Sequence, residues 1–216
     1  MVSRATESEV VLVLGVVTRT RYNKPMTAIL EKPITRGAIE MPLMRVDLRL
    51  YDRMIEAGIF DSGHSVELLE GLILEREPMK PLHYTRVKHI YDRLLSQFEN
   101  LATVYSEVPI ELPNDGRPQP DIVLADIGAG ELEYARPNQV HLLIEVTDSS
   151  LERDRDFKGF LYARDGIREY WIVDLNAGNL EVYRNPNGER YENVITVKSQ
   201  EFIACLAFPE IKIDWS

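Results

Sequence analysis

Hydrophobic residues recur at helical spacing in three parts of the chain. Residues 47–58 carry apolar side chains three and four positions apart, which predicts a short helix. A second helix is predicted over 83–98, where one stripe of the helix surface is apolar. A third is predicted over about 150–165, opened by Ser149 with Glu152 three residues later, the spacing of a capping box.

Short runs of Val, Ile and Leu, bounded by Gly, Pro or Asn, predict β-strands elsewhere. Two such runs, 66–69 and 72–75, are separated by Glu70 and Gly71, and the glycine suits a two-residue hairpin turn. The other predicted strands cover residues 103–112, 121–125, 141–147, 169–173, 180–183 and 190–197. The first three of these are expected to form a central sheet, the third helix to cross over it, and the last three to form a meander. The fold class predicted is α/β, with a mixed central sheet flanked by helices.

The first 40 residues show no sustained period and contain several prolines, so we expect an N-terminal arm, disordered or a tail, before a single domain over 41–216. The apolar run 10–17 is far shorter than the roughly 20 residues that a membrane-spanning helix needs. Glu7 and Glu9 precede it, which does not suit a signal peptide. A cytoplasmic protein without a membrane partner is expected.

Composition narrows the function classes. With 44% hydrophobic and 28% charged residues, the 216-residue chain is neither disordered nor a polytopic membrane protein. Its 25 Lys and Arg against 35 Asp and Glu give a net charge of −10, which argues against non-specific coating of nucleic acid. Any nucleic-acid site must therefore be local. The one cysteine, Cys205, excludes an intrachain disulfide and a cysteine metal cluster and fits a reducing compartment.

Two acidic residues stand where a purely structural sheet would have none. Glu145 lies inside the apolar run 142–146, which predicts a central strand buried on both faces, and an unpaired carboxylate there would cost several kcal/mol. It therefore needs a cationic partner, an arginine in the simplest case, or a metal ion. Asp121, at the start of a neighbouring predicted strand, either caps a local turn or shares a divalent ion such as Mg²⁺ or Mn²⁺ with Glu145.

The crossover helix carries a candidate cation. At 3.6 residues per turn, Asp154 and Lys158 fall within the arc that should be buried, so they either reach a site at the sheet or form an i,i+4 ion pair. The carboxylates of Asp121 and Glu145 could bind a metal ion, and the ammonium of Lys158 could position a water and offset charge on a phosphate, so this set of groups suits phosphodiester hydrolysis. The glycines at 128–130 lack the spacing of a dinucleotide-binding loop.

Six blocks of sequence, taken in order, resemble a known family. The blocks are residues 66–71 with a downstream His83, 120–123, 144–146, 154–158, 162–166 and 169–174. Together, over about residues 46–197, the chain resembles the Uma restriction endonuclease family of the PD-(D/E)xK nuclease superfamily.

The resemblance implies a restriction-endonuclease-like core in which Asp121 and Glu145 bind a catalytic Mg²⁺, with Mn²⁺ as a substitute. The superfamily places its lysine two residues after the second acid, where this chain has Thr147, so the resemblance passes the role of orienting the attacking water to Lys158. Glu67 matches a family acid, and it is either an outer-sphere metal or water contact or a solvent-facing hairpin residue.

The function expected from these features is a magnesium-dependent endonuclease acting on DNA. A cut in both strands is naturally made by two copies of one site, so a homodimer is expected. Because the chain is acidic, DNA binding should be weak and strongly dependent on salt. The alternatives are a non-catalytic partner-binding module that retains the fold with a buried ionic network, and a hydrolase of some smaller phosphodiester.

Overall fold

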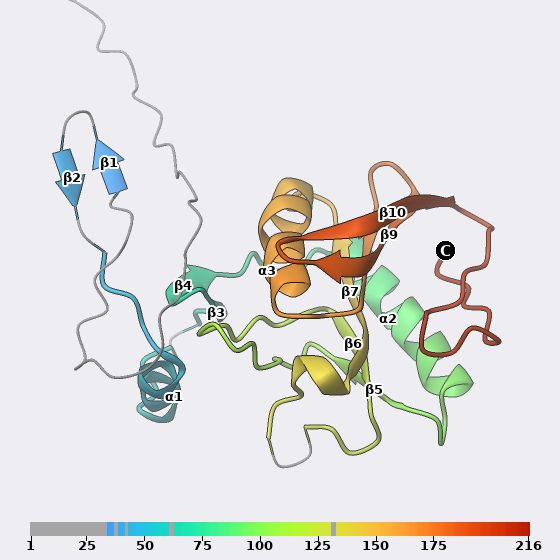
Figure 1. The fold of residues 1–216 in the computed structure, drawn as a ribbon, viewed down its shortest axis with the longest axis horizontal. Helices are drawn as coiled ribbons and strands as arrows, with labels where there is room; N and C mark the ends of the chain where they lie inside the picture. The colour runs from blue at the N-terminus through green and yellow to red at the C-terminus, as the bar shows by residue number, and fades with distance from the viewer. Residues whose placement is uncertain (1–33, 37–38, 42, 61–62, 131–132) are drawn as a thin grey trace, which may run out of the picture.

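The computed structural model describes residues 34–36, 39–41, 43–60, 63–130 and 133–216. Its centre is a six-stranded mixed sheet with strand order β10-β9-β8-β7-β6-β5 (Figure 1). The strands are β5 (Thr103–Ser106), β6 (Ile122–Ala125), β7 (Val140–Thr147), β8 (Glu169–Asp174), β9 (Asn179–Asn187) and β10 (Arg190–Lys198). Strands β7 and β8 are parallel, whereas every other neighbouring pair is antiparallel.

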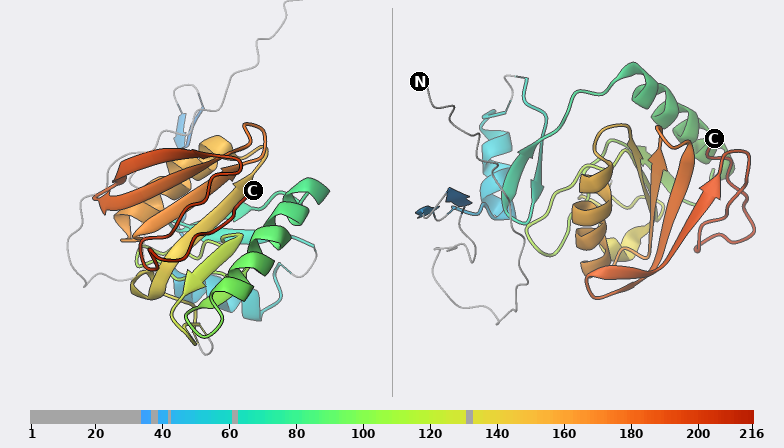
Figure 2. Two further views of the ribbon diagram at one scale, coloured as in Figure 1. Left: turned by 90° about the vertical axis from the view of Figure 1, so that its right-hand side faces the viewer. Right: turned by 90° about the horizontal axis from the view of Figure 1, so that it is seen from above.

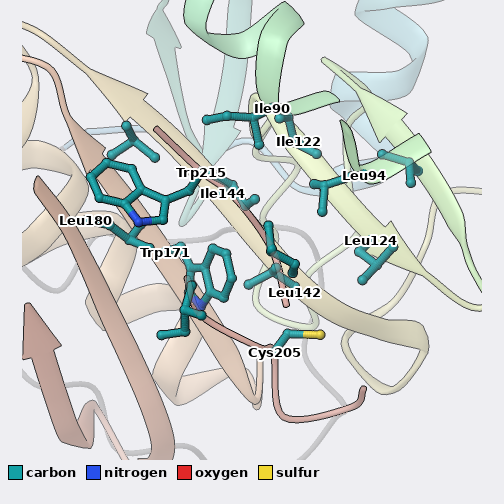
Figure 3. Close-up of a cluster of buried hydrophobic side chains, with 14 of the residues drawn as sticks. Ile90, Leu94, Ile122, Leu124, Leu142, Ile144, Trp171, Leu180, Cys205 and Trp215 are labelled. Carbon is teal, nitrogen blue, oxygen red and sulfur yellow. The ribbon is translucent and has the colours of Figure 1, made fainter. Parts of the chain in front are cut away.

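Helices cover both faces of this sheet (Figure 2). Helix α2 (Pro81–Gln97) packs on one face, where Ile90 and Leu94 meet Leu142 and Ile144 of β7 in the core shown in Figure 3. The chain between β7 and β8 covers the other face with η2 (Arg153–Lys158) and α3 (Gly159–Arg164). Successive residues of β7 therefore point to opposite helices, and odd-numbered residues such as Leu143 face α3.

The crossover helix contains a π-helical segment, η2. The amide of Gly159 donates to the carbonyl oxygen of Asp154, five residues back, rather than to that of Arg155. In this wide turn, residues four and five apart lie almost above one another. Asp154 and Lys158 therefore both point inward, and both are buried.

Smaller elements precede the sheet. Helix α1 (Leu48–Glu56) begins at the N-cap residue Asp47, whose side chain accepts a hydrogen bond from the Leu50 amide. The hairpin of β3 (Val66–Leu69) and β4 (Leu72–Glu75) turns at Glu70 and Gly71, both with positive φ, as predicted. A bridge between Leu68 and Arg117 joins the hairpin to the rest of the domain. The remaining elements are β1 (Ile34–Arg36) paired with β2 (Ile39–Met41), and the 3₁₀ turn η1 (Pro137–Gln139).

The predicted α/β class with a mixed sheet and flanking helices is confirmed, and three details differ. The strand predicted over 103–112 ends at Ser106, because the next residue, Glu107, has a φ of +54° that breaks extended structure. The predicted capping box is wrong, since the Ser149 hydroxyl donates to Glu77 instead of accepting from an amide at the start of the helix. The arm lies mostly outside the described residues, but its end contains the unpredicted pair β1–β2.

No helix in the described part of the chain is long and apolar enough to cross a membrane.

Candidate active site

Two carboxylates meet on the α3 face of the sheet. In the antiparallel pair β6–β7, Ile122 stands opposite Ile144, so one step further along the register places Asp121 opposite Glu145. Opposite residues share a face of the sheet and lie close together. The Val146 amide donates to Oδ2 of Asp121 at 2.7 Å, which fixes this carboxylate against β7. Asp121 and Glu145 are only 3% and 5% exposed.

Lys158 brings an ammonium group to these acids from the crossover helix. Its Nζ donates to Oε1 of Glu145 at 2.9 Å and lies 3.3 Å from Oε2 of Glu67, while the side chain is almost fully buried. The hydroxyl of Tyr162, one turn further along the helix, donates to the same oxygen of Glu145 at 3.0 Å. The sheet, the crossover helix and the β3–β4 hairpin thus all contribute to one network.

The network borders a cavity of about 170 Å³, which Asp121, Glu145, Glu67 and Lys158 all line. His83, in the first turn of α2, also lines it, with Nε2 3.1 Å from Oδ2 of Asp121. The ring N–H is not aligned for a hydrogen bond, so this buried nitrogen makes a close charge contact only. The four acids and bases predicted for the site are therefore brought together around one cavity.

Negative charge is in excess around this cavity. Among the residues that the structure describes, seven carboxyl groups line it, against four lysine and arginine side chains. Burial raises the pKa of Glu145 above its ordinary value; Lys158 opposes the shift, while the charges of Asp121, Asp154 and Glu67 add to it. The site as it stands therefore has room for further positive charge.

For the two basic groups, neighbouring carboxylates outweigh the effect of burial on the pKa. Burial alone would lower the pKa of Lys158, but Glu145, Glu67 and Asp154 outweigh it, and the pKa is raised. Burial likewise opposes charging of His83, and its contact with Asp121 outweighs this and raises its pKa. Lys158 is thus held as a cation, suited to donate hydrogen bonds and unsuited to accept a proton.

The donor set fits a hard divalent cation that keeps part of its water shell. Within the described residues, no hydrogen bond reaches Oδ1 of Asp121 or Oε2 of Glu145, so each of these two cavity-lining acids retains one oxygen without a donor. Mg²⁺ is commonly bound through one or two carboxylates and several waters. Among the described residues there is no group of three or more His, Cys, Asp or Glu side chains arranged to hold a metal. The fit is therefore to a two-carboxylate site and not to a fully protein-lined cage.

Several expectations about single residues are now decided. Glu67 is not a solvent-facing hairpin residue, because it is 2% exposed and paired with Lys158. Lys158 pairs with Glu145 and Glu67, whereas Asp154 accepts a hydrogen bond from Ser150 at 2.6 Å, so no i,i+4 pair accounts for their burial. The partner of Glu145 is this lysine and not the arginine of the simplest case.

Tyr162 was not predicted as a site residue, yet it donates to Glu145. Asp154, which was expected either to reach a site at the sheet or to form an ion pair with Lys158, lines the cavity. Both belong to the inward arc of the crossover helix, and a polar group in such an arc was the available signal. His83, named above only beside the first block of the family resemblance, faces Asp121.

Comparison with known proteins identifies the family of this chain. The model of the Uma2 family, described as "Putative restriction endonuclease", matches residues 48–216. The chain belongs to the Uma2 family. The match covers the sheet, both covering helices and the β3–β4 hairpin, so every residue of the network described above lies within the Uma2 region.

A solved structure shares the fold. It is the crystal structure, at 1.96 Å resolution, of a putative nuclease belonging to DUF820 from Anabaena variabilis ATCC 29413. The TM-score is 0.57 at 16% sequence identity, over 71% of this chain and 89% of that one. A search of curated proteins gives no match. The family is thus the one that the resemblance implied, and the fold is shared with a structure described as a putative nuclease.

Proposed function

We propose that this Uma2 protein is a metal-dependent phosphodiester hydrolase that cuts DNA. The observation that carries the proposal is the convergence of Asp121, Glu145 and Lys158 on one face of the sheet, beside a cavity with excess negative charge. A purely structural ion network would balance its charges, whereas this one retains a surplus of buried carboxyl groups. Membership of a family described as restriction endonucleases supports the same reading.

Asp121 and Glu145 would hold Mg²⁺, or Mn²⁺ in its place. When bound, such an ion supplies positive charge that stabilises the phosphate group and makes a nearby water more acidic. The same charge would favour the ionised form of Glu145, which burial disfavours.

Lys158 has a separate task in the proposal. Its ammonium contacts Glu145 and Glu67 and lines the cavity, so its position is set before substrate arrives. A pre-oriented cation can position a water or stabilise negative charge on the phosphate without reorganisation. Glu67 acts through Lys158 and is a positioning residue.

The metal and the ammonium can be tested separately. Mn²⁺ is titrated by calorimetry into the wild type, Asp121→Asn and Glu145→Gln, with Glu169→Gln as control, because Glu169 is equally buried but pairs with Arg184 away from the cavity. We expect one site in the wild type and control, and at least tenfold weaker binding in the two site variants. Absence of a site in the wild type would refute the proposal.

Lys158→Met should bind Mn²⁺ yet cleave a DNA duplex at least a hundredfold more slowly, on the scale of losing one preorganised charge. Undiminished cleavage would assign the role to another cation. A protein that binds no metal and cleaves nothing would instead be the non-catalytic module, its buried ionic network serving only the fold.

Substrate and assembly complete the proposal. DNA is the substrate proposed, and a homodimer would place two sites on the two strands of a duplex. Cleavage assays with duplex, single-stranded and RNA oligonucleotides test the first point. Light scattering of the purified protein tests the second, and a monomer that still cuts both strands would contradict it.

A further inference from the structure

One positive side chain at the cavity has no negative partner among the described residues. Four lysine and arginine residues line the cavity, and three of them form ion pairs. The pairs are Arg76 with Glu107 at 3.5 Å, Lys80 with Asp148 at 2.8 Å, and Lys158 with Glu145 at 2.9 Å. The fourth, Arg153, has no ion pair or hydrogen bond to its guanidinium within the described part of the chain.

The position of Arg153 makes this lack of a partner costly. Its Nε is buried from solvent and has no hydrogen-bond partner. A buried donor left unpaired reduces stability, because folding removes its water and returns nothing. The neighbouring Asp154 feels the charge, which opposes the rise in its pKa on burial, but its carboxylate accepts from Ser150 instead. The guanidinium of Arg153, which lines the cavity, thus has no acceptor among the residues that the structure describes.

We propose that Arg153 binds the phosphodiester group of the nucleic-acid substrate, a role that rests on the proposed function. A guanidinium presents a planar fork of N–H donors that matches two non-bridging phosphate oxygens. Arg76 and Lys80 are partly neutralised by carboxylates, so they attract an anion less strongly. Arg153 lies one residue before Asp154 and one helical turn from Lys158, which places the bound phosphate next to the acids and the ammonium.

Arg155 offers a matched control on the same helix. Its guanidinium donates to Glu181 of β9, and it does not line the cavity. Arg155→Gln removes the same formal charge from the chain as Arg153→Gln, two residues away. An effect of net charge alone would therefore appear equally in both variants.

The experiment measures binding of a fluorescent duplex oligonucleotide by anisotropy, in Ca²⁺, at several salt concentrations. Arg153→Gln should weaken binding by about ten- to a hundredfold, the range for a lost charge-assisted contact. The slope of log K against log salt should fall by about 0.9, the contribution of one phosphate contact. Arg155→Gln should change the dissociation constant by about twofold or less and leave the slope unchanged.

Arg153→Lys separates charge from geometry and remains informative if the glutamine variant folds poorly. Lysine keeps the charge and lacks the fork, so the salt slope should stay at the wild-type value while affinity falls. Equal effects of Arg153→Gln and Arg155→Gln would overturn the inference, as would wild-type affinity and slope in Arg153→Gln, or a wild type that binds no oligonucleotide.

Cleavage by the wild type in Mn²⁺ is read in parallel, and it distinguishes the two proposals. A wild type that cleaves, together with an Arg153→Gln variant of unchanged kcat/KM and slope, would overturn the role of Arg153 and leave the hydrolase proposal intact. A wild type that binds DNA through Arg153 and fails to cleave in any divalent ion would support the role of Arg153 and overturn the hydrolase proposal.

Discussion

Glu145→Gln should stabilise the metal-free protein at neutral pH, although it removes a candidate catalytic group. Burial, reinforced by neighbouring carboxylates, raises the pKa of Glu145 from 4.5 to about 8. The folded protein therefore takes up a proton at pH 7 that the unfolded chain does not hold. Glutamine avoids this cost and keeps an oxygen that can accept from Lys158 and Tyr162, the two donors that Oε1 now serves.

The size of the effect follows from the proton balance. Between the ordinary value of 4.5 and pH 7 the cost grows by about 1.4 kcal/mol per pH unit, which gives about 3 kcal/mol. For a domain of this size that corresponds to a rise in Tm of about 6–12 °C. The sign is fixed by the direction of the shift. The contribution of protonated Glu145 to wild-type stability is fully present below pH 4.5 and is lost as pH rises toward 8. The glutamine variant has no such loss.

The assay is chemical and thermal unfolding in EDTA from pH 4.5 to pH 8.5, followed by tryptophan fluorescence. Glu169→Gln is the control, because that buried carboxylate accepts from Arg184, from the Trp171 ring and from the Leu206 amide, so glutamine should destabilise the protein there. If Glu145→Gln is destabilised to the same extent, then Glu145 is ionised beside Lys158 at pH 7, folding takes up no proton there, and the argument from excess charge is wrong.

Two further predictions concern residues away from the cavity. Burial would raise the pKa of Glu181, but its hydrogen bonds with Arg155 and Tyr183 outweigh burial and lower it. Arg155→Gln should therefore reduce the free energy of unfolding by up to about 1 kcal/mol at pH 7, and this loss should disappear as pH falls below the ordinary value of 4.5. Urea titrations at pH 7 and pH 3.5 check this, and a loss of stability independent of pH would contradict it. Gly71→Ala should reduce the free energy of unfolding by at least about 1 kcal/mol more than Gly188→Ala in the same titration. Both glycines have positive φ, but a Cβ at Gly71 would lie 2.9 Å from the Cβ of Arg45, whereas a Cβ at Gly188 would meet open space. Equal losses would show that φ alone sets the cost.

The elements that the sequence predicts well are those with local signals. The hairpin at Glu70 and Gly71 is encoded by the turn residues themselves, and the helix that became α2 by its apolar stripe. Glu145 was predictable as a site residue because a carboxylate inside an apolar strand is a local contradiction that only a partner can resolve.

What the sequence did not show depends on contacts between distant segments. The burial of Glu67 requires the hairpin to dock beside a helix about ninety residues later in the chain, and no pattern near Glu67 reveals this. The contact of His83 with Asp121 depends in the same way on how α2 meets the sheet. The π-helical turn is invisible because an apolar period read at 3.6 residues per turn fits α-helix and a single wide turn almost equally well.

The wide turn of η2 has a consequence for how relatives of this protein can diverge. A π-turn contains one residue more than an α-turn, so the segment is equivalent to a single-residue insertion confined to one place in the helix. Deleting one residue between Asp154 and Lys158 would let the helix wind regularly, and Arg153, then four residues from Lys158 instead of five, would keep nearly the same face. The packed half, with Leu161 and Tyr162, would stay in register with the sheet. A relative shorter by one residue in this segment could thus keep both halves of the helix, and the side chains they carry, in the same orientation toward the sheet.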